Sequence, residues 1–92
     1  MPMLSNSEVA HHLKALPNWQ IEKFELVRTF QFEHFRAALR FVNQVADLAE
    51  AAGHHPDIDI RYNRVRLALT THDAGGLTAK DFDLATAADK LV

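Results

Sequence analysis

A run of apolar residues at helical spacing between Phe35 and Gly53 constrains the fold of this chain more than any other feature. The run predicts one long amphipathic helix, because side chains three and four residues apart share a helix face. Its apolar members are Phe35, Leu39, Val42, Ala46 and Ala49, and Gly53 is the expected stop. Segments of alternating apolar and polar residues lie on both sides of this helix. The chain is therefore expected to carry one hairpin before the helix and another after it.

The two hairpins follow from the period-two alternation and from their turns. The first is predicted between Trp19 and Phe32, with the turn at 23–25. The second is predicted between Ile58 and Leu69, with the turn near Asn63. Alternation of this kind indicates antiparallel strands with one wet face.

Two capping boxes predict the remaining helices. Ser5-Asn6-Ser7-Glu8 precedes a short helix that Pro17 ends, and Thr78-Ala79-Lys80-Asp81 precedes a last helix that runs on through Leu91. The order is helix, hairpin, helix, hairpin, helix. This order predicts an α+β fold in which a four-stranded antiparallel sheet carries three helices on one face.

Composition narrows the class of protein. A chain of 92 residues is expected to form a single domain, 1–92. The net charge of −2 gives no general attraction to nucleic acid or to an anionic membrane. The absence of cysteine excludes disulfides, zinc–thiolate sites and thiol nucleophiles. No long apolar run and no signal-peptide pattern occur, so a cytoplasmic location is expected.

Three histidines are the candidate site. Pro56 keeps His55 out of the α region, and Gly53 permits a sharp change of direction before His54. His72 follows the second hairpin, and in an antiparallel pair the start of one strand lies beside the end of the next. We therefore expect all three imidazoles in one pocket. The unperturbed pKa of histidine, about 6.5, lets such a group give and take protons near neutrality.

Purely structural roles are also open to several polar residues of this chain. Surface histidines are common, and His11-His12 is interpreted as a helix-surface pair. A metal site is not expected, because adjacent residues in extended backbone point apart. The capping box alone explains Asp81, and Glu50 is either a solvated surface residue or a partner that orients a histidine.

The pattern Glu50-x3-His54-His55-Pro56-x5-Tyr62-x9-His72-x8-Asp81 closely resembles the signature of the pterin-4a-carbinolamine dehydratases. In that family the same protein also acts as the dimerisation cofactor of a homeodomain transcription factor. The resemblance extends to the chain length and to the order of elements. Some relatives carry an acid immediately before the first motif histidine, where this chain has Gly53.

The resemblance implies a hydro-lyase that converts 4a-hydroxytetrahydrobiopterin to quinonoid dihydropterin and water during tetrahydrobiopterin recycling. It implies histidine general acid–base catalysis without a cofactor or a metal. By this resemblance His54 and His72 exchange protons and His55 positions the pterin ring. Substrate contacts or supporting roles are implied for Pro56, Glu50, Asp81, Thr70 and Thr71, with the two threonines offering backbone groups.

The expected partners follow partly from the resemblance and partly from the sheet. A homodimer is expected first and a homotetramer next, with the strand from Leu26 to Phe32 as the open edge that pairs with a second copy. An aromatic amino acid hydroxylase or a regulatory protein is a further implied partner. The alternative function is a protein-binding regulatory module, similar to a transcription coactivator, with little or no catalysis.

Overall fold

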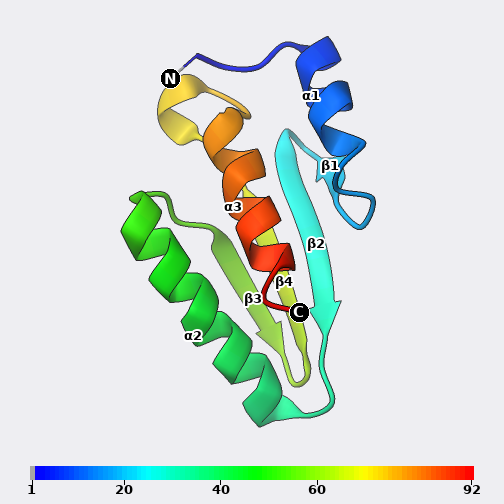
Figure 1. Ribbon diagram of the computed structural model, residues 1–92, viewed down its shortest axis with the longest axis vertical. Helices are drawn as coiled ribbons and strands as arrows, with labels where there is room; N and C mark the ends of the chain where they lie inside the picture. The colour runs from blue at the N-terminus through cyan, green and yellow to red at the C-terminus, as the bar shows by residue number, and fades with distance from the viewer. Residues whose placement is uncertain (1) are drawn as a thin grey trace.

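The computed structural model describes residues 2–92, so Met1 of the predicted domain lies outside it. Three α-helices, four strands and one short 3-10 helix follow one another in the predicted order (Figure 1). They are α1 (Asn6–Leu13), β1 (Gln20–Glu22), β2 (Glu25–Gln31), α2 (Phe35–Ala52), β3 (Asp57–Arg61), β4 (Arg64–Leu69), η1 (His72–Ala74) and α3 (Ala79–Asp89).

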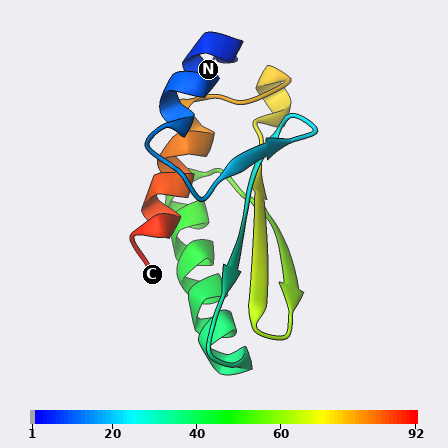
Figure 2. The same ribbon diagram turned by 90° about the vertical axis from the view of Figure 1, so that its right-hand side faces the viewer.

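The strands form one antiparallel sheet in the order β1-β2-β4-β3. The two hairpins are joined by the pairing of β2 with β4, in which Phe30 lies opposite Val65. All three helices lie on one side of the sheet and leave its other face uncovered (Figure 2). The predicted fold class is therefore confirmed.

The predicted edge strand needs a correction. Leu26 and Val27 of β2 pair with β4 on one side and with β1 on the other, so this part of the strand is interior. β1 is only three residues long, and within the described chain Arg28 to Gln31 pair with β4 alone. The outer strands are β1 and β3. Alternation predicts a strand but does not say which strand lies beside it.

Local signals define the helix ends. Ser5 and Glu8 form the predicted capping box, and the backbone N–H of Ser5 lowers the pKa of the Glu8 carboxyl below its usual value. α2 ends at Gly53, whose φ of 62° is the left-handed conformation that favours glycine. α1 ends at Leu13, ahead of Pro17, and α3 ends two residues before Leu91.

Both hairpins turn through two residues. Lys23 and Phe24 connect β1 to β2 with positive φ, as a tight hairpin requires. Tyr62 begins the turn between β3 and β4 with φ 51°, and its ring stacks on Phe35 at an interplanar angle of 4°. This turn is at the opposite end of β3 from the histidine pair. Tyr62 is therefore a turn residue in this chain and does not line the candidate site.

The core fills the space between the sheet and the helices. Its fully buried members include Leu26, Val65, Leu67, Ala38, Val45 and Ala85. At the C-terminal end of α3, Asp89 accepts hydrogen bonds from Trp19 Nε1 at 2.8 Å and from Arg28 at 2.7 Å. Within residues 2–92, no helix has the length and apolar character that a bilayer crossing requires.

Candidate active site

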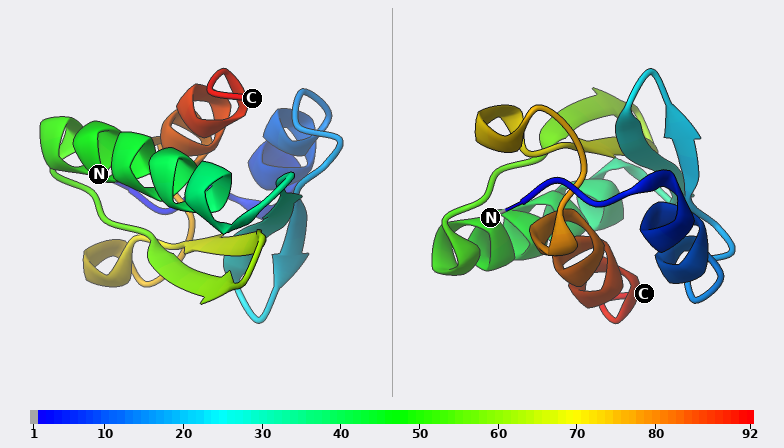
Figure 3. Two further views of the ribbon diagram at one scale, coloured as in Figure 1. Left: turned by 90° about the horizontal axis from the view of Figure 1, so that it is seen from below. Right: turned by 90° about the horizontal axis from the view of Figure 1, so that it is seen from above.

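The candidate site lies at one end of the sheet, where four segments meet. The extended segment after α2 enters β3, and β4 runs antiparallel beside β3 and leads into η1. The register fixes this proximity, because Asp57 at the start of β3 lies opposite Ala68 near the end of β4. Both views in Figure 3 show η1 on the same side of the molecule as the segment that follows α2. The first turn of α3 completes the site.

A pocket of about 270 Å³ opens at this end of the sheet. The residues that line it are Gly53, His54, His55, Thr70, Thr71, His72, Asp73 and Lys80. The predicted convergence of the three histidines is therefore confirmed. Their chemical roles stay predictions.

His54 is the most buried of the three histidines. Its side chain is only 11% exposed, and its Nε2 lies 2.6 Å from Oδ1 of the fully buried Asp81. Its backbone N–H donates to the carbonyl of Ala49 at the end of α2. A buried carboxylate on one ring nitrogen fixes the orientation of an imidazole.

Asp81 combines two duties. Its Oδ2 accepts the backbone N–H of Thr78 at 2.9 Å, which is half of the predicted capping box. The same oxygen accepts the hydroxyl of Thr71 at 2.9 Å, while Oδ1 faces His54. The helix cap and the histidine contact therefore use different oxygens of one carboxylate.

His55 contacts a different carboxylate from His54. Its Nε2 lies 2.5 Å from Oε2 of Glu50, and both side chains are largely exposed, at 62% and 77%. Both interpretations of Glu50 agree with the structure, since its carboxylate contacts His55 while its side chain is solvated. Since both groups are well solvated, the pair adds little stability.

His72 is presented by a short loop rather than by a strand. Thr71 and Gly76 bridge across this loop, and Gly75 closes η1 with φ 78°. The imidazole is exposed and makes no hydrogen bond within residues 2–92. The backbone N–H of Thr71 donates to the Gly76 carbonyl, so Thr71 reaches other groups at the site through its hydroxyl.

The remaining predicted residues differ in how close they come to the pocket. Thr70 lines it, and its hydroxyl donates to the carbonyl of Phe24 at 3.4 Å. Pro56 is partly buried and lies between the histidine pair and β3. Asp73 and Lys80 also line the pocket but were not predicted. Their positions beside His72 and Asp81 were the signal in the sequence that could have found them.

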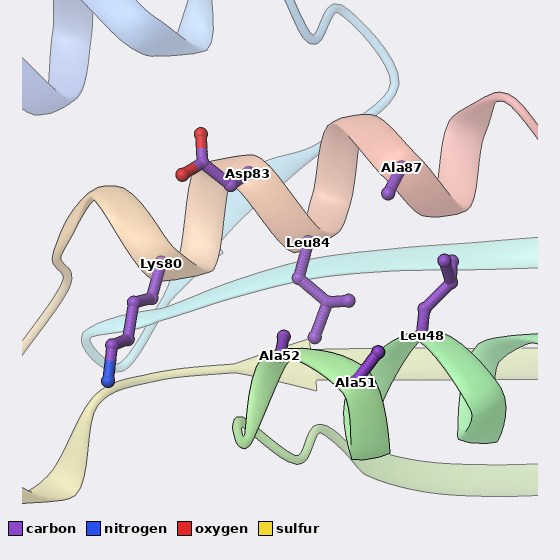
Figure 4. A pocket seen from close by; sticks show the side chains of 7 residues that line it. All are labelled: Leu48, Ala51, Ala52, Lys80, Asp83, Leu84 and Ala87. Carbon is purple, nitrogen blue, oxygen red and sulfur yellow. The ribbon is translucent and has the colours of Figure 1, made fainter.

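The described residues contain no group of three histidine, cysteine, aspartate or glutamate side chains placed to hold a metal ion. A second hollow of about 440 Å³ lies between α2 and α3, where Leu48 and two alanines of α2 face Leu84 and Ala87 of α3 (Figure 4). Its charged lining residues are Lys80 and Asp83, and no histidine lines it. The three histidines therefore line the smaller of these two hollows.

The fold and the pocket together define a class of protein: a small α+β domain that presents several imidazoles at one end of an antiparallel sheet. Comparison with known proteins gives the family. The family model for pterin 4 alpha carbinolamine dehydratase matches residues 2–91. The chain belongs to this family, which confirms the predicted resemblance.

Individual relatives cover the whole chain. A relative from Chloroflexus aurantiacus, whose name assigns it to the pterin-4-alpha-carbinolamine dehydratases, is 65% identical over 100% of this chain and 99% of its own length. A relative from Acidobacterium capsulatum with the same assignment is 55% identical over the full length of both chains. The crystal structure of a transcriptional coactivator/pterin dehydratase from Brucella melitensis superimposes with a TM-score of 0.93, at 35% identity over 97% of each chain.

A more distant structure has the same fold. It is a pterin dehydratase-like protein described as a RuBisCO assembly factor in the alpha-carboxysome. The TM-score is 0.65, at 24% identity over 79% of this chain and 84% of the other. At this identity the likeness concerns the fold alone.

Proposed function

We propose that this protein is a hydro-lyase that converts 4a-hydroxytetrahydropterin to quinonoid dihydropterin and water in the histidine pocket. The single observation that carries the proposal is the convergence of His54, His55 and His72 on one pocket in a member of this family. Tetrahydrobiopterin recycling is the process that this reaction serves.

The reaction needs one acid and one base. The acid donates a proton to the hydroxyl on C4a, and the C4a–O bond breaks so that water leaves. The lone pair of the neighbouring ring nitrogen forms the new double bond to C4a, and the base removes the proton from that nitrogen. One proton is given and one is taken, so the total charge of the acid and the base is unchanged. Each group recovers its own protonation state by proton exchange with solvent before the next turnover. Groups that titrate near neutrality suit both steps.

We assign the two proton transfers to His54 and His72. His54 is held by the buried Asp81, and an imidazole that is oriented in this way needs no reorganisation when it reacts. His72 is exposed, so it can exchange protons with water between turnovers. We assign ring positioning to His55, which Glu50 orients at the rim. Thr70 forms part of the wall that the pterin edge contacts. Pro56 restricts the backbone of the neighbouring His55.

The pocket volume is consistent with this substrate class. At about 270 Å³ it is slightly smaller than the usual range for small-molecule sites, roughly 300–1,000 Å³, and suits a compact bicyclic ring. In the carbinolamine, the lone pair of the neighbouring nitrogen already assists departure of the hydroxyl group. An open site that supplies roughly 10²–10⁴-fold acid–base assistance is therefore adequate.

Stopped-flow absorbance of freshly generated 4a-hydroxytetrahydropterin tests the proposal. The rate constant for decay is expected to rise in proportion to protein concentration and to saturate with substrate. Decay that is independent of the protein at all concentrations would contradict the proposal.

A protein-binding role is the second candidate, because the Brucella melitensis structure carries the description of a transcriptional coactivator as well as a pterin dehydratase. In this role the protein would bind a regulatory partner or an aromatic amino acid hydroxylase. Co-purification of such a partner with a chain that lacks dehydratase activity would favour this candidate over the enzyme.

A further inference from the structure

Two threonine hydroxyl groups form a chain of hydrogen bonds that ends on the buried carboxylate of the site. Thr71 Oγ1 lies 2.9 Å from Oδ2 of Asp81 and 2.8 Å from Thr78 Oγ1. The backbone N–H of Lys80 donates to Thr78 Oγ1 at 3.3 Å. Thr78 and Asp81 are fully buried, and Thr71 is partly buried.

The directions of these hydrogen bonds follow from counting protons. A carboxylate only accepts, so the single hydroxyl proton of Thr71 is donated to Asp81. Thr71 Oγ1 must then accept from the hydroxyl of Thr78, which in turn accepts from Lys80 N–H. The chain runs one way, from the first turn of α3 to the carboxylate. Aligned hydrogen bonds of this kind polarise one another in a buried setting.

The same counting fixes the proton on His54. Oδ1 of Asp81 can only accept, so the Nε2 that lies 2.6 Å away must carry the hydrogen. In the neutral ring, Nδ1 is then the nitrogen with a free lone pair. Nδ1 makes no hydrogen bond within residues 2–92, and no buried side-chain nitrogen or oxygen among them lacks a partner. Nδ1 is therefore open to solvent in the pocket.

We infer that Thr71 is a positioning residue for His54: its hydroxyl, oriented by Thr78, holds Asp81 so that Nε2 keeps its proton and Nδ1 is presented to the substrate. This inference rests on the proposed function, because the substrate that Nδ1 faces is the pterin of that reaction. It assigns the reacting atom of His54 and gives Thr71 a side-chain role that acts through Asp81.

The test combines ring ¹⁵N spectra of labelled histidine with stopped-flow kinetics on the full-length chain. At a pH where the ring is neutral, the wild-type spectrum should show the Nε2–H form of His54. Thr71→Val, which has nearly the same shape but no hydroxyl, should raise the Nδ1–H fraction. It should also lower kcat by about tenfold, the usual scale for one lost hydrogen bond to a charged group, with little change in KM.

Thr71→Ser is the matched control, because it restores the hydroxyl and should restore both readouts. Thr71→Ala removes the hydroxyl without adding an apolar branch and serves if the valine variant does not fold. A wild-type ring in the Nδ1–H form overturns the inference, and so does a folded Thr71→Val or Thr71→Ala chain with wild-type tautomer and kcat. Nε2–H in the wild type and a tautomer change in Thr71→Val, in a chain with no dehydratase activity, would uphold the positioning and refute the proposed function.

Discussion

Nε2 of His54 lies 2.6 Å from Oδ1 of Asp81, and this contact joins the segment after α2 to the first turn of α3. Asp81 is the capping-box acid of α3 and at the same time the partner of a pocket histidine. A helix cap is a favourable place for a carboxylate, because the helix N-terminus stabilises negative charge there. The local helix signal therefore also positions the imidazole.

Asp81→Asn tests this dual role. The three groups that face the carboxylate are all donors, so the amide NH₂ of asparagine must either meet a donor or force His54 into its Nδ1–H form, in which Nε2 accepts. We expect a loss of about tenfold or more in dehydration rate and about 1–3 kcal/mol in the free energy of unfolding. Stopped-flow rates and urea denaturation measure the two effects. Asp83→Asn makes the same change at an exposed position of α3 and should alter neither; full activity in Asp81→Asn would refute the orienting role.

Gly53→Ala should destabilise the protein through backbone strain alone. The residue has φ of 62°, and an added Cβ would meet nothing within 4 Å. The left-handed conformation costs an alanine about 1–2 kcal/mol, whereas asparagine tolerates it better. Thermal or urea unfolding of Gly53→Ala and Gly53→Asn should rank the asparagine variant closer to wild type. Equal stability of all three chains would show that this cap is not what ends α2.

Asp89→Ala should lower the free energy of unfolding, because Asp89 joins the C-terminal end of α3 to Trp19 and Arg28. It removes the acceptor of the buried Trp19 N–H and of Arg28, whose guanidinium lies 4.1 Å above the Phe30 ring centroid. A buried donor left unsatisfied costs about 1–3 kcal/mol, so urea denaturation should show a fall of that size in the free energy of unfolding. Asp47→Ala on the exposed side of α2 is the control. A similar small fall in both variants would mean that Asp89 adds no more than a surface residue.

A homo-oligomer is expected, with β3 as the edge that joins two copies. β3 pairs only with β4 among the described residues, and its Ile58 and Ile60 are 37% and 38% exposed. Long edge strands with apolar side chains invite strand pairing. Light scattering at micromolar concentration should give a dimer mass or a multiple of it.

Paired charge substitutions locate the interface. Ile58→Lys with Ile60→Lys should shift the mass toward the monomer, whereas Gln20→Lys with Glu22→Lys on the other outer strand should leave it unchanged. The reverse result would place the interface at β1, and an unchanged mass in both variants would place it at Arg28 to Gln31 of β2, which within residues 2–92 also pair with β4 alone. A monomeric wild type would refute the oligomer.

Sequence patterns predicted the elements of this fold well because their signals are local. Both capping boxes, the stop at Gly53 and both turns depend on neighbouring residues. The position of His72 could also be predicted, since a two-residue turn forces the end of β4 back beside the start of β3.

Contacts between segments that are far apart in the chain could not be predicted from these local patterns. The pairing of β2 with β4 joins segments that are far apart in the chain, and alternation carries no information about such neighbours. For the same reason β2 was predicted as an edge. The contact of Thr71 with Asp81 was missed because it depends on how α3 docks against the loop after β4. Tyr62 belongs to the family pattern, yet here it forms a turn at the other end of β3.

The most direct test of the central claim is the stopped-flow rate of 4a-hydroxytetrahydropterin decay with the double variant His54→Ala, His72→Ala. If these imidazoles carry the proton transfers, the catalysed rate should fall by about 10²-fold or more while the chain stays folded. His11→Ala, on the exposed side of α1, should retain the wild-type rate. A double variant with wild-type activity, or an equal loss in His11→Ala, would contradict the assignment of catalysis to the histidine pocket.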